Sequence, residues 1–325
     1  MRFGIPRYIQ LYPTTRCNQN CIFCFNVNNK KIRDLTFGDS LKLLDILSDL
    51  DIREIDIMGG EPLLLSWMPD FVRNAIRKNI AINISTNGSN TDILKRFPGA
   101  NPGMLNIGVS LEGSTAAKHD TITNSKHFKS SFNSIQALID LELNPVVKTV
   151  ITKSSLGDIR NIINILRDAG VRRYCILHMD LFSLNASLKN DCLSYTAFSE
   201  FYNEIRLENH DISIDKVHAS CFDKNNLPSG TRCAGGVNKL SVLPDGSVFP
   251  CNLFHAIGRF NLGNIFKDDF SEIWMNPKLD IFREFRTNRC GVEGCDNRQS
   301  CTGGCPAHGL YHYGDPDRAD IRCLL

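Results

Sequence analysis

The 325-residue sequence predicts an α/β protein built on a parallel sheet. Strand-like runs alternate with helical patterns from Tyr8 to Asn209, the order expected when crossover helices join parallel strands. A composition of 42% hydrophobic and 22% charged residues is ordinary for a globular chain. Six strand-helix units would make an incomplete barrel that is open on one side, although a doubly wound open sheet would give the same alternation.

The predicted strands are short runs rich in apolar and β-branched residues. In chain order they are Tyr8 to Tyr12, Glu54 to Met58, Ile80 to Thr86, Met104 to Leu111, Val146 to Thr152 and Arg173 to Met179. Two of the connecting helices have clear start signals. The segment from Thr36 to Asp39 resembles a capping box before apolar residues at helical spacing, and the segment from Ser155 to Asp158 repeats it before a helix that ends at Gly170.

Three cysteines follow the first predicted strand with the spacing C-x3-C-x2-C, at Cys17, Cys21 and Cys24. Three thiolates can hold a four-iron cluster while leaving one iron open. A local zinc site would be incomplete, because the next histidine is His119 and the next cysteine is Cys175. A disulfide framework is disfavoured because the 13 cysteines are odd in number and no secretory signal precedes them.

With Phe23 directly before the last cysteine, this motif resembles the cluster motif of the radical S-adenosylmethionine (radical SAM) superfamily. The resemblance implies that SAM chelates the open iron. It also implies that an electron from the reduced cluster cleaves SAM to methionine and a 5'-deoxyadenosyl radical. The cofactor would then carry the hard chemistry, while the protein orients it and excludes water. Together with the count of six units, the resemblance favours a partial (β/α)6 TIM-like barrel.

Segments after the other predicted strands resemble the family's SAM contacts. Met58 to Pro62 is similar to its Gly-Gly-Glu segment, in which glycines allow close backbone approach and a carbonyl accepts from the SAM amino group, although a plain turn is the alternative. Short polar side chains after the third and fourth strands would contact ribose and methionine. A serine after the fifth would touch the SAM carboxylate or only cap a helix. The predicted SAM-binding residues are Gly59, Gly60, Glu61, Ser85, Asn87, Ser110, Glu112 and Ser154.

The last hundred residues contain a second cysteine system. Lys239 to Pro250 predicts a hairpin that turns at Asp245-Gly246. The paired C-x2-C knuckles typical of zinc ribbons are absent. The arrangement resembles the SPASM extension of radical SAM enzymes, with a first cysteine, a Gly-x4-Cys hairpin from Gly246 to Cys251, a four-cysteine block and a final cysteine. We therefore expect a partial barrel over residues 1–215 and a small cysteine-rich α+β SPASM domain over 216–325.

The SPASM resemblance implies two auxiliary [4Fe-4S] clusters, and so three clusters in all. One would use Cys290, Cys295, Cys301 and Cys323, and the other Cys233, Cys251 and Cys305. Cys221 is the candidate fourth ligand of the second set; without it that iron would be open. The sequence departs from the family in having four residues between Cys290 and Cys295 where two are common.

The resemblance favours modification of a ribosomally made peptide by crosslinking, epimerisation or oxidation. Asn252 stands after the hairpin cysteine in place of the aspartate of the sulfatase-maturing branch, which argues against that branch. The first strand begins near Tyr8, so leader recognition would come from a separate protein or be absent. The alternative is a radical SAM dehydrogenase or decarboxylase acting on a small molecule such as an amino sugar or tetrapyrrole. A non-catalytic electron carrier would not need the SAM-like segments.

Three side chains are candidates for catalysis. Cys192, in a polar stretch, could return a hydrogen atom to a substrate carbon, with an inert surface thiol as the alternative. His178 and Asp180 alternate at the end of the sixth strand, where either could act as a base or the two could form a satisfied polar pair. Cys175, inside that strand, is more simply a small buried hydrophobe.

Charge and hydropathy restrict the partners. With 37 basic and 35 acidic side chains the formal charge is +2, and no basic run indicates a nucleic-acid or membrane partner. No apolar stretch approaches the roughly 20 residues that span a bilayer. We expect a cytoplasmic protein, since a reducing compartment suits thiolate-bound iron, with an external electron donor such as flavodoxin or ferredoxin.

Overall fold

The computed structural model describes residues 4–28, 32–99, 103–182, 186–285 and 290–325. Within them a 10-stranded sheet has the order β10-β9-β8-β1-β2-β3-β4-β5-β6-β7. From β1 to β7 the neighbouring strands are parallel and follow chain order, without the reversal that defines a doubly wound sheet. These strands are β1 (Tyr8–Leu11), β2 (Glu54–Ile57), β3 (Ala81–Thr86), β4 (Leu105–Ser110), β5 (Val146–Ile151), β6 (Arg173–His178) and β7 (Ser213–Val217).

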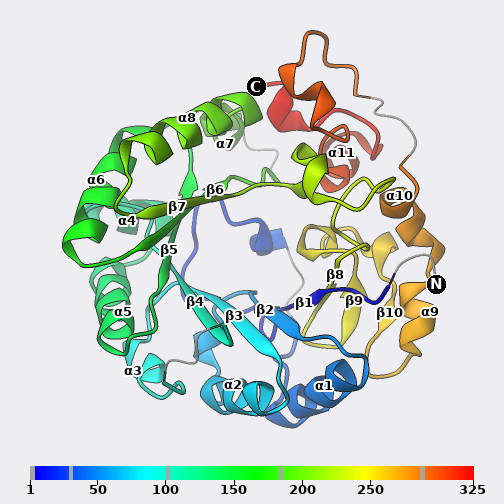
Figure 1. The fold of residues 1–325 in the computed structure, drawn as a ribbon, viewed down its shortest axis with the longest axis horizontal. Coiled ribbons are helices and arrows are strands. Elements are labelled where there is room, and N and C mark those ends of the chain that lie inside the picture. Colours follow the sequence, from blue (N-terminus) through cyan, green and yellow to red (C-terminus); the bar gives the residue numbers. More distant parts are fainter. Residues whose placement is uncertain (1–3, 29–31, 100–102, 183–185, 286–289) are drawn as a thin grey trace.

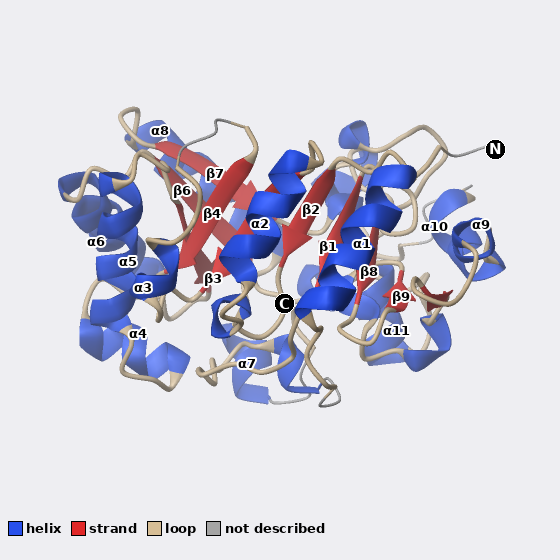
Figure 2. Ribbon diagram, turned by 90° about the horizontal axis from the view of Figure 1, so that it is seen from below, coloured by secondary structure: helices blue, strands red, loops and turns tan. Residues whose placement is uncertain are grey.

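Helices surround the outer face of the curved sheet, as Figures 1 and 2 show. Isoleucines of the strands point toward them and are 0–1% exposed, among them Ile55, Ile57 and Ile82. The alternate residues, such as Asp56 and Asn83, are polar and face the barrel interior. The partial-barrel prediction is therefore confirmed. The helices are α1 (Phe37–Asp49), α2 (Met68–Arg77), α3 (Thr91–Leu94), α4 (Ala116–Thr123), α5 (Phe128–Asp140), α6 (Leu156–Asp168), α7 (Ala186–Asp191) and α8 (Tyr195–Glu208).

All six predicted strands form, and their ends agree to within one residue. The seventh parallel strand, β7, was not predicted from the sequence. It lies at the edge of the sheet and alternates only weakly, since Ile214 is its one buried residue. An edge strand that is exposed on one face lacks the apolar run that identifies a fully buried strand.

The two predicted helix caps differ in outcome. Thr36 caps α1 as expected, with its Oγ1 accepting a hydrogen bond from Asp39 N at 3.0 Å. The second capping box is wrong, although α6 begins where predicted. Ser155 makes no cap bond to the helix, because its Oγ accepts from Thr152 N at 2.9 Å. The Asp158 carboxylate instead accepts from Ser114 N at 2.8 Å.

The C-terminal region continues the barrel sheet. Its hairpin forms as predicted, and Gly246 has the positive φ of 86° that the turn requires. β8 pairs in parallel with β1, placing Leu240 beside Ile9, so one sheet runs through both regions. The boundary between 215 and 216 stays a prediction. This region contains β8 (Lys239–Val242), β9 (Ser247–Phe249), β10 (Gly263–Asn264), α9 (Phe270–Trp274), α10 (Asp280–Arg283) and α11 (Pro306–Tyr313).

No helix among the described residues is long and apolar enough to cross a membrane.

Candidate active site and iron-sulfur ligands

A cavity of about 480 Å³ opens at the carboxyl ends of β1 to β4, where parallel α/β folds place their ligands. Its volume falls in the range of small-molecule sites. It brings together the cysteine motif and most of the predicted SAM-binding residues. Its lining includes Cys17, Cys21, Cys24, Gly59, Gly60, Glu61, Ser85, Asn87, Ser110 and Glu112.

The loop that carries the three cysteines is fixed by its backbone. Asn20 N and Ile22 N donate to the carbonyls at the end of α4, Thr123 O at 3.1 Å and Ile122 O at 3.0 Å. None of the thirteen cysteines, all of which lie in the described ranges, forms a disulfide. Burial raises the pKa of Cys17 and of Cys21 above the ordinary value, so metal binding would have to displace protons from these thiols. Three cysteines that form no disulfide and line an open cavity fit an iron-sulfur cluster with one exposed iron.

The two glycines after β2 make contact with the cysteine loop. Gly60 N donates to Thr14 O at 3.0 Å, and Glu61 N donates to Arg16 O at 2.7 Å. A Cβ on Gly60 would lie 1.9 Å from Arg16 O, and Gly59 has a φ of 124°. We expected these glycines to let the backbone approach a ligand closely. In this structure they let it approach the segment that leads into Cys17.

Glu61 braces the loops after β2 and β3. Glu61 is 1% exposed. Its carboxylate accepts hydrogen bonds from Thr86 Oγ1 and Asn87 N, both at 2.7 Å, and from Leu63 N at 2.9 Å. Burial raises its pKa, and these hydrogen bonds oppose the rise. Asn87 in turn donates to Asn18 Oδ1 at 2.8 Å. Glu61 therefore holds the loop carrying Asn87 against the cysteine loop.

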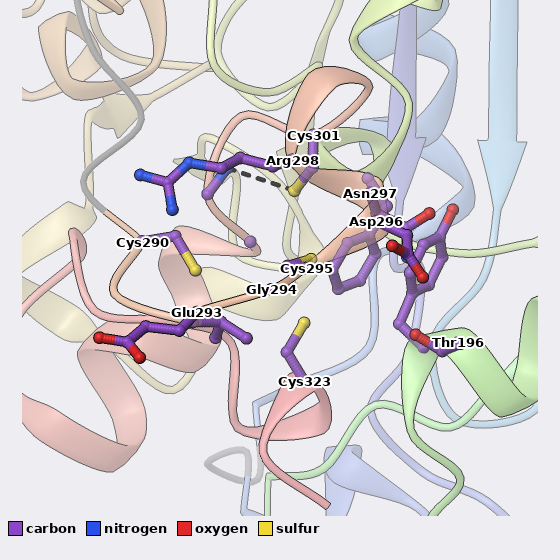
Figure 3. Close-up of a pocket in the computed structure, with 15 residues that line it drawn as sticks. Thr196, Cys290, Glu293, Gly294, Cys295, Asp296, Asn297, Arg298, Cys301 and Cys323 are labelled. Carbon is purple, nitrogen blue, oxygen red and sulfur yellow. Dashed lines mark hydrogen bonds between the residues drawn. The ribbon is translucent and has the colours of Figure 1, made fainter.

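A second group of sulfurs surrounds a cavity of about 220 Å³ in the C-terminal region. Figure 3 shows Cys290, Cys295, Cys301 and Cys323 turned toward this space. The additional residues between the first two cysteines include Gly294, whose φ of 64° turns the chain along the cavity wall. The longer spacing therefore still brings all four predicted sulfurs to one cavity.

A third group of four cysteines is buried between β8, β9 and α11. Cys221 is 0%, Cys233 8%, Cys251 6% and Cys305 4% exposed. Burial raises the pKa of Cys221, and its contact with Cys305 and the charge of Cys233 raise it further. As thiolates these cysteines would repel one another, which a bound cation would relieve. The structure places Cys221 in this group.

Comparison with known proteins agrees with this geometry. Residues 11–187 match the radical SAM superfamily, and residues 233–306 match SPASM, an iron-sulfur cluster-binding domain. The chain belongs to the radical SAM superfamily. It is a radical SAM enzyme with a C-terminal SPASM domain, which implies SAM and iron-sulfur clusters as its cofactors.

Several known proteins are similar to this chain over nearly its whole length. The PqqA peptide cyclase of Streptomyces rochei is 22% identical over 99% of this chain and 90% of its own. The subtilosin biosynthesis protein AlbA of Bacillus subtilis is 22% identical over 95% and 69%. Solved structures of Streptococcus suis SuiB, bound to S-adenosylmethionine or to precursor peptide SuiA, are 17% identical and superpose with a TM-score of 0.78. They cover 99% and 100% of this chain and 78% and 77% of theirs.

Ser154 lies apart from the other predicted SAM-binding residues and does not line the cavity. Its Oγ donates to Asp191 Oδ2 at 2.9 Å, and its N donates to Asp191 Oδ1 at 2.8 Å. The side chain fastens the loop after β5 to the end of α7. Its contact with SAM stays a prediction.

The three predicted catalytic side chains all have partners away from the cavity lining. His178 stacks on Phe198 with ring centroids 4.6 Å apart, and its Nε2 lies 2.9 Å from Leu193 O. Burial lowers its pKa to about 3, so it is neutral. Asp180 accepts from Arg322 Nη1 at 2.9 Å. Cys192 is 0% exposed, so the surface-thiol alternative is wrong. Their catalytic roles stay predictions.

The sequence did not indicate a buried polar network beside Cys305. His308 Nε2 accepts from Leu181 N at 3.0 Å, which leaves its other nitrogen facing Asp320 Oδ2 at 3.8 Å. Ligand atoms of Cys305, His308 and Asp320 lie within 4.8 Å of one another. The Asp320 carboxylate is already occupied, since it accepts from Arg322 at 2.9–3.0 Å and from Cys305 N at 3.1 Å. We therefore interpret this group as support for Cys305 and not as a separate metal site.

Changing Gly60 to Ala is expected to disorganise the cysteine loop, because the new Cβ would meet the Arg16 carbonyl at 1.9 Å. Overpacking of this kind costs about 1–3 kcal/mol or more. The melting temperature and the iron content after anaerobic reconstitution would both fall. Gly157→Ala is the matched control, because nothing lies within 4 Å of its Cβ position in α6, and it should be neutral or stabilising. Equal iron content in the two variants would contradict this account.

Changing Glu112 to Gln is expected to flatten the pH dependence of stability. Burial raises the pKa of Glu112 from its ordinary 4.5 to about 8. Between these values the unfolded chain has lost a proton that the folded chain keeps, so wild-type stability falls as pH rises. The amide can still accept from Val150 N, as the carboxyl does at 2.9 Å.

Melting temperatures of the SAM-free proteins at pH 5 and pH 8 would test this prediction. The variant should match wild type at the lower pH and exceed it by at least about 2 °C at the higher. Parallel declines of both proteins with pH would show that Glu112 is not the group responsible.

Proposed function

We propose that this radical SAM enzyme modifies a ribosomally made peptide by crosslinking, epimerisation or oxidation. The observation that carries the proposal is the gathering of eight C-terminal cysteines into two groups, in a chain that also forms a SAM-type cavity. The similarity to PqqA peptide cyclase, AlbA and SuiB over nearly the whole chain supports it.

Cys17, Cys21 and Cys24 would hold the cluster that binds SAM, because they form no disulfide and share one cavity with the polar ends of β3 and β4. When bound, the cluster and SAM supply a 5'-deoxyadenosyl radical that abstracts hydrogen from the substrate. Ser85, Asn87 and Ser110 would orient SAM, and Glu112, neutral below about pH 8, could donate a hydrogen bond from its carboxyl group.

The C-terminal cysteines would hold two auxiliary clusters, which gives three per chain. For the cluster held by Cys233, Cys251 and Cys305, Cys221 would be the fourth ligand and would complete the ligation. Auxiliary clusters would take up the electron that an oxidative modification releases, and an external donor such as flavodoxin or ferredoxin would supply the reducing electron. A separate protein would present the leader of the precursor peptide.

The proposal is tested by incubating the cluster-loaded enzyme with SAM, dithionite and synthetic precursor peptides encoded beside its gene. Mass spectrometry would then detect loss of two hydrogens for a crosslink or oxidation, and deuterium gain in D₂O for epimerisation. Omission of SAM is the control. Turnover of an amino sugar or tetrapyrrole with no change in any peptide would replace this proposal with the small-molecule alternative.

A further inference from the structure

A lysine lies inside the barrel at the edge of the candidate SAM cavity. Lys148 is on β5, directly beside Ser110 of β4 in the strand register. Its Nζ donates to Ser85 Oγ on β3 at 2.8 Å. Ser85 and Ser110 line the cavity, whereas Lys148 does not. The ammonium group is therefore held behind the cavity wall, toward the barrel interior.

This ammonium lacks an ion pair. Among the residues that the structure describes, no carboxylate oxygen lies within ion-pairing distance of Lys148 Nζ. Its hydrogen-bond acceptor is the hydroxyl of Ser85. The charges that act on it from farther away are the carboxylate of Asp56 and the guanidinium of Arg173. Burial lowers the pKa of Lys148. A mostly buried ammonium whose counter-charge, Asp56, lies beyond ion-pairing distance gains stability when an anion joins it directly.

The barrel wall is shaped to hold this side chain. Lys148 crosses β4 at Gly108 to reach β3, and a Cβ on Gly108 would lie 2.4 Å from Lys148 Cε and 2.8 Å from its Nζ. Gly108 lies within a regular strand and is not among the glycines of positive φ, so its backbone does not require glycine. The missing side chain therefore leaves a channel for the lysine.

We propose that Lys148 binds a carboxylate of the substrate at the inner wall of the barrel, which makes an acidic side chain a requirement of the substrate peptide. Two ammonium hydrogens remain after the bond to Ser85, enough for a charge-assisted pair with one carboxylate. This inference rests on the proposed peptide substrate. The other source of the same chemistry is the methionine carboxylate of SAM, which Lys148 would meet only across the cavity wall.

The test is calorimetric titration of the cluster-loaded, SAM-saturated enzyme with N-acetyl-L-glutamic acid α-amide and with its uncharged isostere, N-acetyl-L-glutamine α-amide. Wild type should bind the acid about tenfold more tightly than the amide. Lys148→Met should lose this preference. Gly108→Ala should reduce it while keeping the lysine, because the new Cβ displaces only the flexible end of that side chain. Lys153→Met, an exposed lysine in the next loop, is the charge control and should keep the preference.

A preference that is absent from wild type, or that survives in Lys148→Met, overturns the proposal. A separate titration with SAM distinguishes the two sources. A tenfold loss of SAM affinity in Lys148→Met, without any preference for the acid in wild type, assigns the ammonium to SAM and also overturns it. If the enzyme modifies no peptide but still prefers the acid, the proposed peptide substrate is wrong, whereas the carboxylate-binding site at Lys148 stands.

Discussion

Alanine at Cys17, Cys21 and Cys24 together is expected to abolish formation of 5'-deoxyadenosine from SAM and dithionite. The three sulfurs share the cavity that is lined by Glu61, Ser110 and the other SAM-type residues. No other cysteine lines that cavity, so no spare thiol in the described part of the chain could replace them. The loss of activity should be complete, because under the proposed function the electron would reach SAM through the iron that these thiolates would hold.

Iron analysis makes this expectation specific. The triple variant should lose about four irons per chain and keep the C-terminal clusters. Cys175→Ala is the matched control, because this cysteine is buried in β6 and outside every predicted ligand group. It should keep both iron and activity. Deoxyadenosine from a triple variant that has lost its iron would show that the cluster lies elsewhere.

The barrel strands could be predicted because burial on the helix-covered face imposes apolar alternation that is visible in one sequence. Ile55 and Ile57 of β2 and Ile82 and Ile84 of β3 alternate with polar residues over four to six positions. β7 has no such pattern, since Ser213 and Asp215 flank its single buried isoleucine and Lys216 follows. An edge strand such as β7 forms because it pairs with the neighbouring strand β6, and this pairing is not visible in the local sequence pattern.

In the candidate site, too, local patterns could be predicted and contacts between distant parts of the chain could not. The spacing of the cysteines indicated which of them belong together. The sequence did not indicate why residue 60 has to be glycine. Its glycine is required by the Arg16 carbonyl 44 positions earlier in the chain, and only the fold brings the two together. Cys192 illustrates the opposite error. Its polar sequence neighbours suggested a surface position, whereas Met179, Leu181 and Ile321 bury it.

Arg322 and its partners were beyond sequence prediction for the same reason. Arg322 Nη1 donates to Asp180 Oδ1 at 2.9 Å, and the two residues are 142 positions apart. Asp320, close in sequence, accepts from Arg322 Nε at 3.0 Å and Nη2 at 2.9 Å. Although burial opposes it, the guanidinium holds the pKa of Asp320 far below its usual range, so both groups stay charged.

Changing Arg322 to Met is therefore expected to destabilise the protein by about 3–5 kcal/mol, because it leaves buried carboxylates without a counter-charge. Arg322 and Asp320 are 0% exposed. The effect should reach both C-terminal cysteine groups, since Asp320 accepts from Cys305 N at 3.1 Å and Arg322 directly precedes Cys323. Denaturant unfolding and iron content of the reconstituted protein would measure it.

Two further variants separate loss of the charge pair from loss of packing. Arg318→Met removes an exposed arginine of the same segment and should change stability by no more than about 0.5 kcal/mol. The double variant Asp320→Asn with Arg322→Met should cost less than the sum of the two single changes, because it removes the buried charge together with its partner. Additive costs, or an Arg322→Met protein as stable as Arg318→Met, would mean that packing alone joins the barrel to the auxiliary cysteines. Sub-additive costs would instead identify the Asp180–Arg322–Asp320 network as the electrostatic link between the end of β6 and the loop that carries the last predicted cluster ligand.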